Sequence, residues 1–270
     1  MRFAYYIKKR ALREDSGIMS VLDGLRAAGS DVYNIVEGLR EGTDMLLSFG
    51  GDGTFLSAAR LVAEAGVPVL GINLGRLGFL SEYKLDEFSS AVLKGEYTIE
   101  NREMLKVEVE GGNPSGFWPY ALNEVSVHRS GAAMLGVDVS LDGKEAPTYW
   151  ADGLLVSTSS GSTAYSLSVG GPICMPDVDA FIIAPIAPHN LNVRPLVVGS
   201  RTSICVSMRS RSDRSVLLSL DNSDFEVPVG TRLNISAAPF PLRWVRLSES
   251  NFIDALRSKL FWGEDVRNLL

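Results

Sequence analysis

The spacing of apolar residues follows one pattern up to about residue 97 and another pattern over most of the remaining chain. In the first part, short apolar runs predict strands at 2–7, 31–36, 44–49 and 67–72. Apolar residues at helical spacing predict helices at 18–25, 56–65 and 85–93, with glycines after them as stop signals. Strands that alternate with helices through short connections predict an open, mostly parallel sheet with helices on both faces.

After residue 97 the pattern changes to alternation of apolar and polar residues. The alternating segments are 105–110, 137–141 (followed by the turn Asp142-Gly143), 204–208, 216–220, 233–236 and 244–247. Short strands separated by Gly, Asn, Asp and Pro predict an antiparallel, sandwich-like all-β domain. Helical spacing returns at 251–260, and we expect this helix to pack back onto the first domain. The sequence thus predicts an α/β domain over 1–97, an all-β domain over 98–248 and a returning C-terminal helix over 249–270.

A glycine-rich segment, Gly50-Gly51-Asp52-Gly53-Thr54, follows the third expected strand. Ligands of open parallel sheets bind at the carboxyl ends of the strands. Glycines allow close approach to the backbone, and free amides at a helix N-terminus attract anions, so the segment is a candidate phosphate site. The alternative is that Asp52 caps the following helix and the glycines shape a turn. Neither the three-glycine dinucleotide motif nor a Gly-Lys-Ser/Thr phosphate loop is present.

Three further segments carry candidate binding residues. The glycine-rich segment 71–80 contains Arg76 and Phe79 as candidates. The alternative is that this segment is an ordinary turn with Phe79 in the core. Asn123 and Glu124 are neighbours in an apolar strand, so a bend or bulge is needed for both to face one ligand; otherwise they decorate an edge strand. The segment 151–172 is rich in hydroxyls and glycines, which suits close hydrogen bonding to sugar and base edges, although a low-complexity loop would have the same composition.

Composition limits the classes of function. The chain has 270 residues, of which 46% are hydrophobic and 21% charged, as in globular proteins. A net charge of −6 argues against a general nucleic-acid binder but allows an anionic substrate. No apolar run is long enough to span a membrane, and the N-terminus does not read as a signal peptide, so we expect a cytoplasmic protein. Two histidines and two distant cysteines offer no zinc-ligand spacing.

Taken together, these segments resemble the NAD kinase family. The resemblance rests on 50–54, Asn123-Glu124 and 152–172, with support from 101–105 and 186–189, and runs in order along almost the whole chain. The first motif is shared with lipid kinases of the diacylglycerol and sphingosine type and, more loosely, with phosphofructokinases, whereas the third is more specific. The resemblance implies transfer of the γ-phosphoryl group of ATP, or of polyphosphate in some members, to the 2′-hydroxyl of the adenosine ribose of NAD, giving NADP.

The resemblance also implies a role for each candidate residue. Asp52 would be the general base with Gly53 beside it, and Phe79 would pack on the adenine. The other residues expected to bind NAD are Asn123, Glu124, Thr163, Ala164, Tyr165, Ser168 and Asn222. Asp152 and Ala187 would act on a neighbouring subunit's ligand, which implies a homodimer or tetramer with shared sites. Trp150 stands where many relatives carry a basic residue.

Fewer residues are candidates for binding the phosphoryl donor. Gly50, Gly51, Thr54 and Arg76 are the candidates, with Mg²⁺ or another divalent cation held mainly by the nucleotide. Two other functions remain open at this point: a lipid kinase that shares the first motif, and a regulator that binds NAD without turnover. The intact Asp52 argues against the regulator.

Overall fold

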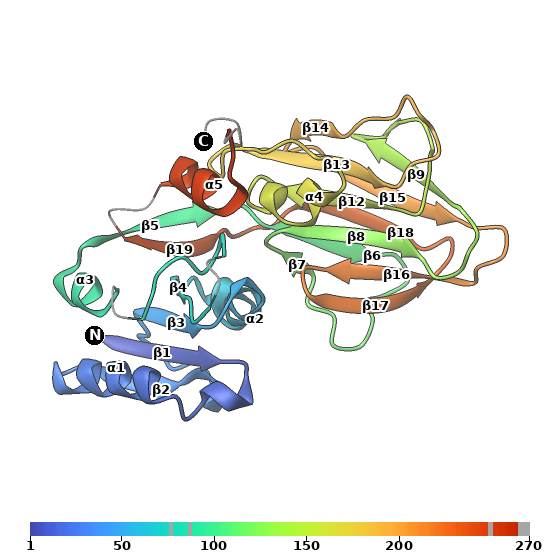
Figure 1. Ribbon diagram of the computed structural model, residues 1–270. Coiled ribbons are helices and arrows are strands. Elements are labelled where there is room, and N and C mark those ends of the chain that lie inside the picture. Colours follow the sequence, from blue (N-terminus) through green and yellow to red (C-terminus); the bar gives the residue numbers. More distant parts are fainter. Residues whose placement is uncertain (76–77, 86–87, 248–250, 264–270) are drawn as a thin grey trace. The chain divides into compact units, whose positions relative to one another are not determined.

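The computed structural model describes residues 1–75, 78–85, 88–247 and 251–263 (Figure 1). The chain forms two compact units, Met1–Asn101 with Leu242–Leu270, and Arg102–Pro241. Among the residues described, no helix is long and apolar enough to cross a membrane.

The first unit contains a sheet with the strand order β2-β1-β3-β4-β19-β5. Its strands are β1 (Arg2–Ile7), β2 (Asp31–Asn34), β3 (Met45–Phe49), β4 (Val69–Ile72), β5 (Tyr97–Arg102) and β19 (Leu242–Leu247). The pairs from β2 through β19 are parallel. The helices are α1 (Ser16–Ala27), α2 (Asp52–Val62), α3 (Phe88–Lys94) and α5 (Phe252–Leu260). Every residue of β3 is buried, as expected for a parallel strand covered on both faces.

Alternate residues of β3 explain how the helices cover the sheet. Met45, Leu47 and Phe49 belong to one core cluster with residues of α1 and α3. The other face of the sheet meets α2, whose Phe55 packs edge-on against Trp244 of β19 with ring centroids 5.9 Å apart. The expected α/β architecture is therefore confirmed, and the helix expected at 251–260 is α5, which begins after its cap Asn251.

The second unit is a sandwich of two antiparallel sheets. One has the order β10-β9-β15-β18-β6-β7, with β11 beside β9, and the other has the order β14-β13-β12-β8-β16-β17. The elements are β6 (Leu105–Val109), β7 (Tyr120–Ala121), β8 (Glu124–Arg129), β9 (Leu135–Leu141), β10 (Lys144–Glu145), β11 (Tyr149–Ala151), β12 (Gly153–Thr158), α4 (Tyr165–Ser168), β13 (Ala180–Ile186), β14 (Leu196–Gly199), β15 (Ile204–Arg209), β16 (Ser215–Leu220), β17 (Ser223–Pro228) and β18 (Arg232–Ala237).

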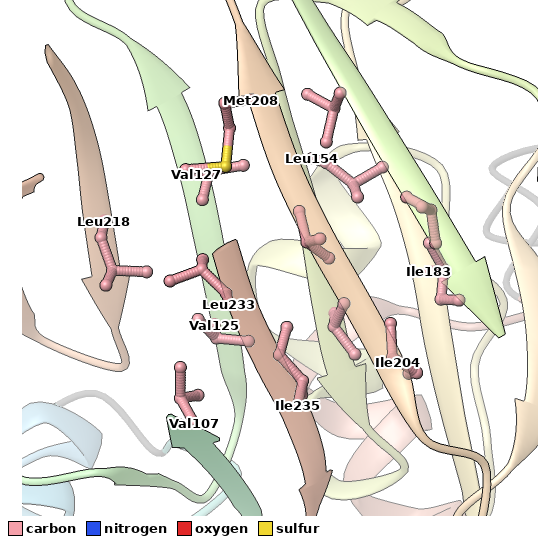
Figure 2. Packing of buried hydrophobic residues seen from close by; sticks show 14 of the residues in the cluster. Val107, Val125, Val127, Leu154, Ile183, Ile204, Met208, Leu218, Leu233 and Ile235 are labelled. Carbon is pink, nitrogen blue, oxygen red and sulfur yellow. The ribbon is translucent and has the colours of Figure 1, made fainter. Parts of the chain in front are cut away.

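The core of the second unit consists of aliphatic side chains from both sheets. Figure 2 shows Val125, Val127, Leu154, Ile183 and Leu218 from one sheet facing Val107, Ile204, Met208, Leu233 and Ile235 from the other. These residues occupy alternate positions of their strands, so the period-two pattern predicted the sandwich correctly. The turn predicted at Asp142-Gly143 is also present, with φ of 49° and 76° in the two residues, as a tight hairpin requires.

Two strand assignments need correction. The segment 244–247 was expected among the antiparallel strands, but it lies in β19, which pairs with β4 of the first sheet. Its period-two pattern cannot indicate which sheet a strand joins. The segment 121–125 was expected to be one strand, but the chain leaves β7 in one sheet at Ala121 and enters β8 in the other sheet at Glu124.

Candidate active site

The first glycine-rich segment connects the carboxyl end of β3 to the N-terminus of α2. Gly50 has φ +153°, and a β-carbon there would lie 2.4 Å from the hydroxyl of Thr54, so a side chain cannot be accommodated. A β-carbon at Gly51 or Gly53 would meet no described atom within 4 Å. The structure therefore places Gly50, Gly51, Gly53 and the buried Thr54 together at a helix N-terminus with open space beside the backbone, a suitable arrangement for an anion.

The Asp52 carboxylate accepts three backbone hydrogen bonds from the second glycine-rich segment. The amide of Phe79 donates to Oδ2 at 2.9 Å, and the amides of Leu80 and Ser81 donate to Oδ1 at 3.0 and 2.9 Å. A β-carbon at Gly78 would lie 1.9 Å from Oδ1, so only glycine allows this approach. A carboxylate has about four acceptor positions, and the one left over is on Oδ2.

This geometry excludes one of the two interpretations of Asp52. The N-cap of α2 is Gly51, and no side chain caps this helix. The capping interpretation is therefore wrong, because the Asp52 side chain bonds to the other loop rather than to the first turn of its own helix. Asp52 is a carboxylate held by three amides at the carboxyl end of a buried strand, with one acceptor position that no described residue fills.

Phe79 makes its described ring contacts with α5. Its ring centroid lies 6.3 Å from that of Phe252, and the Nζ of Lys259 lies 4.9 Å from its centroid. The predicted contact with adenine stays a prediction. Arg76, the basic candidate of this segment, lies outside the described residues.

In the second unit, the chain bends at Leu122 and Asn123, which is the geometry that the sequence needed for Asn123 and Glu124 to face one ligand. The Asp221 carboxylate accepts hydrogen bonds from the amides of Leu122, Asn123 and Glu124 at 2.8, 2.8 and 3.2 Å. In return, the amide of Asp221 donates to the carbonyl of Glu124 at 3.0 Å. The side chains of Asn123 and Glu124 are nearly buried, with residue exposures of 8% and 9%. They are part of a clamped bend rather than of an exposed edge strand.

The sequence interpretation missed Asp221. It occupies the first position of the two-residue turn between β16 and β17, next to the candidate Asn222, and has φ 49°. A tight Asp-Asn turn between two alternating strands is a recognisable signal. The partner of its carboxylate is about a hundred residues earlier in the chain, and no local pattern reveals that pairing.

Burial changes the protonation of this carboxylate pair. Burial, and then the charge of Asp221, raise the pKa of Glu124 to about 8, although a backbone hydrogen bond from Tyr165 lowers it in part. Burial also raises the pKa of Asp221 to about 6, against the effect of its three amide donors. At neutral pH Glu124 is therefore mostly protonated, so its carboxyl group can donate as well as accept a hydrogen bond.

The hydroxyl-rich segment packs directly on this bend. The hydroxyls of Thr158 and Ser157 donate to the carbonyls of Leu122 and Asn123 at 2.6 and 3.1 Å. A β-carbon at Gly161 would lie 2.2 Å from the carbonyl oxygen of Asn123. The segment is thus ordered structure rather than a low-complexity loop, and several of its hydroxyls bond to the backbone instead of being free for a ligand.

The turns after β12 bring further candidates to the same place. A 3₁₀ turn at Ser160–Thr163 leads through Ala164 into α4, which contains Tyr165 and Ser168. The Tyr165 ring stacks on His128 with centroids 5.9 Å apart and an interplanar angle of 17°. Because the backbone of Tyr165 also bonds to Glu124, the structure brings Asn123, Glu124 and Tyr165 together, with Thr163, Ala164 and Ser168 on the adjoining turns.

Asp152 and Ala187 lie at the other end of β12. Gly153 pairs with Ile186, whereas Ser157 pairs with Glu124. Five residues of extended strand, about 16 Å, therefore separate Asp152 from the Asn123 bend. Asp152 forms an ion pair with Arg129 at 2.6 Å, and Ala187 has φ 46°. Within one chain, the structure does not bring these two residues together with Asn123 and Glu124.

A cavity of about 630 Å³ lies in the second unit, beside the residues that flank Asp152 and Ala187 in sequence. Trp150 and His189 line it together with Arg209. The Arg209 guanidinium lies 5.7 Å from the centroid of the Trp150 ring and pairs with Asp138 at 2.7 Å. A basic group is therefore present next to Trp150, contributed by β15 instead of β11. Among the described residues, no group of three His, Cys, Asp or Glu side chains could hold a metal ion.

Comparisons with known proteins agree with this organisation. The model of the ATP-NAD kinase N-terminal domain family matches residues 10–97, and that of the ATP-NAD kinase C-terminal domain family matches residues 122–247. The NAD kinase of Porphyromonas gingivalis is 44% identical over 241 residues, which covers 87% of this chain and 82% of the relative. The NAD kinase of Flavobacterium psychrophilum is 42% identical over 236 residues, which covers 83% of this chain and 78% of the relative.

Two solved structures have the same fold. Yeast NADH kinase complexed with NADH matches with a TM-score of 0.87 and 22% identity, over 98% of this chain and 88% of that one. An NAD kinase from Archaeoglobus fulgidus in complex with ATP matches with a TM-score of 0.77 and 28% identity, over 96% of this chain and 99% of that one. The family models cover most of both units, and the bacterial relatives align across them. The chain therefore belongs to the NAD kinase family.

Proposed function

We propose that this protein is an NAD kinase, which transfers the γ-phosphoryl group of ATP to the 2′-hydroxyl of the adenosine ribose of NAD and releases NADP and ADP. The observation that carries the proposal is the Asp52 carboxylate, held by three amides at the end of a buried parallel strand with one acceptor position unused. The similarity to bacterial NAD kinases along most of the chain supports the choice of substrate.

Asp52 acts on the nucleophile in this proposal. A ribose hydroxyl is a weak nucleophile at neutral pH, and a carboxylate at hydrogen-bond distance can orient it and accept its proton. The hydroxyl oxygen forms a bond to the γ-phosphorus while the bond from that phosphorus to the bridging oxygen of ADP breaks. The free position on Oδ2 is suited to this contact, because the other positions are filled by amides that fix the carboxylate in place.

The clamped bend of the second unit binds the dinucleotide in this proposal. Asn123 and Glu124 bond the adenosine and ribose groups, and Asn222 contacts the dinucleotide from the neighbouring hairpin. Thr163, Ala164, Tyr165 and Ser168 supply the wall of the pocket, and Phe79 packs on the adenine. The raised pKa of Glu124 supports a role as a donor to a sugar oxygen or a base nitrogen.

The donor triphosphate is proposed to bind at Gly50, Gly51 and Thr54, with Arg76 nearby in sequence. The open backbone at the N-terminus of α2 supports this. Mg²⁺ neutralises charge on the phosphates in reactions of this type. No three-ligand group among the described residues fits a protein-held ion, so the ion is proposed to arrive with the nucleotide. Polyphosphate is a further possible donor.

The protein is proposed to act as a cytoplasmic homodimer or tetramer with shared sites. The separation of Asp152 and Ala187 from Asn123 along β12 supports this, because residues so placed can serve a neighbouring subunit's ligand. The absence of a membrane or nucleic-acid partner stays a prediction from the sequence.

One assay tests the proposal against its alternatives. Purified protein is incubated with NAD, ATP and Mg²⁺, and NADP is measured with an NADP-specific dehydrogenase. NADP formation at normal enzymatic rates supports the NAD kinase. NAD binding without NADP formation would instead indicate a regulator, and phosphorylation of diacylglycerol or sphingosine in place of NAD would indicate a lipid kinase.

A further inference from the structure

The loop that holds Asp52 is itself held by the C-terminal helix. Phe79, whose amide donates to Asp52, packs its ring against Phe252 at 6.3 Å, and Lys259 Nζ lies 4.9 Å from the same ring. Phe252 and Lys259 are seven residues apart in α5, so they lie on one face of the helix. That face supplies both an aromatic and a cationic contact to the loop.

A nearly buried carboxylate joins the same loop to two cations. Glu82 Oε1 lies 3.2 Å from Lys259 Nζ, and Glu82 Oε2 lies 2.7 Å from Nη1 of Arg246 on β19. The side chains of Glu82, Lys259 and Arg246 are only 9%, 10% and 6% exposed. Glu100 Oε1 lies 3.9 Å from Arg246 Nε, so two cations face two carboxylates. Removing Lys259 leaves the nearly buried Glu82 with Arg246 as its remaining ion-pair partner among the described residues, so the Glu82 carboxylate is less well compensated and less firmly held.

We propose that Lys259 is a positioning residue for Asp52, acting through Glu82 and Phe79. The amides that hold Asp52 belong to Phe79, Leu80 and Ser81. The ring contact fixes the first residue of this donor segment, and the ion pair fixes the residue that directly follows it. The proposal rests on the proposed function, in which the Asp52 carboxylate accepts the proton of the substrate hydroxyl.

The position of the Asp52 carboxylate matters more than the number of hydrogen bonds it accepts, because the carboxylate must contact a substrate hydroxyl that is already aligned with the γ-phosphorus. A misplacement of about 1 Å costs about 10²-fold in rate even when all groups are present. A loosened donor segment therefore lowers turnover while the chain's other ligand contacts remain.

Hydrogen exchange of the backbone amides of 79–81 reports how firmly this donor segment is held, and the measurement does not depend on enzyme activity. Lys259→Met keeps an apolar stem and removes the charge. Arg257→Met is the matched control, because Arg257 is exposed on the same helix and makes no ion pair within the described part of the chain. We expect the amides of 79–81 to exchange about tenfold faster in Lys259→Met and at the wild-type rate in Arg257→Met. Unchanged exchange in a folded Lys259→Met overturns the proposal.

Kinetics then separate positioning from general stability. For Lys259→Met we expect kcat for NADP formation to fall about tenfold and KM for NAD, to which Phe79 contributes in the proposed function, to rise by a smaller factor, and we expect Lys259→Arg to restore most of kcat. Faster exchange with unchanged kcat also overturns the proposal. If the wild type makes no NADP, the proposed function fails, whereas the exchange result still reports on the contact of α5 with the loop. If Lys259→Met does not fold, Phe252→Leu is used in its place. We expect the same faster exchange of the amides of 79–81 and the same fall in kcat, and unchanged exchange or unchanged kcat overturns the proposal here too.

Discussion

At the residue scale, Asp52 and the amides around it give a direct test of catalysis. In Asp52→Asn, the side-chain oxygen can keep the amides of Leu80 and Ser81, but the new NH₂ group faces the amide of Phe79, and two donors then meet without an acceptor. The variant also cannot take a proton from a hydroxyl. We expect the rate of NADP formation at saturating substrates to fall by about 10²–10⁴.

A second carboxylate in the same unit provides the control for this substitution. Asp15 accepts a hydrogen bond from the amide of Ile18 as the N-cap of α1, and Asn caps a helix about as well as Asp. Asp15→Asn should therefore leave both turnover and melting temperature unchanged. Near-normal turnover in a folded Asp52→Asn protein would show that Asp52 only organises the loop.

Glu124 predicts a dependence of stability on pH. Burial and the charge of Asp221 raise its pKa from 4.5 to about 8. Between these values the folded protein keeps a proton that the unfolded chain has lost, so the free energy of unfolding falls as pH rises through this window. Glu124→Gln resembles the protonated acid and does not titrate. We expect its melting temperature, measured from about pH 5 to about pH 8, to fall less than that of the wild type.

Asp221 does not obscure this comparison. Its pKa is raised to about 6, and its own contribution, which is lost as pH rises from about 4 to about 6, is present in both proteins. Parallel curves of melting temperature against pH for wild type and Glu124→Gln would contradict a protonated Glu124 in the folded protein.

At the scale of elements, the packing of the turn after β12 on the Asn123 bend depends on one glycine. A β-carbon at Gly161 would lie 2.2 Å from the carbonyl oxygen of Asn123, so Gly161→Ala forces the turn and the bend apart. We expect a loss of about 1–3 kcal/mol in the free energy of unfolding and weaker NAD binding on titration. Gly24→Ala in α1 is the control, because no described atom lies within 4 Å of its added carbon and alanine favours the helix. Equal stability of the two variants would contradict the close approach.

The helices and strands also show which features of the fold the sequence alone can predict. Periodicity predicted the parallel sheet, the sandwich and α5, because each burial pattern is local in the chain. It left the bend at Asn123 open, because neighbours in a straight strand face opposite ways and a bend was needed only if both side chains face one ligand. It could not identify Asp221 as the clamp or Phe79 as a partner of α5, because these contacts join segments distant in sequence. The strand at 244–247 was misassigned for the same reason, since its partner β4 is far away in the chain.

At the scale of the whole molecule, β12 separates two groups of candidate residues that the family motifs assign to one ligand. Asn123 and Glu124 lie beside the carboxyl end of this strand, and Asp152 directly precedes its first residue. If the second group serves the NAD molecule bound by another subunit, a single chain does not complete a site. The protein should then be at least a dimer by light scattering.

Mixing two inactive variants tests the shared site directly. Asp52→Asn removes the proposed base, and Asp152→Ala removes the residue proposed to serve the neighbouring subunit, leaving the partly exposed Arg129 to solvent. In a mixed dimer, one site combines the Asp52 of one subunit with the Asp152 of the other, so random exchange should make about a quarter of all sites wild type. NADP formation should rise toward that fraction after the two proteins are mixed under conditions that allow subunit exchange. Mass spectrometry of isotope-labelled subunits checks that exchange occurred, and exchange with no gain in activity means that each chain builds its site alone.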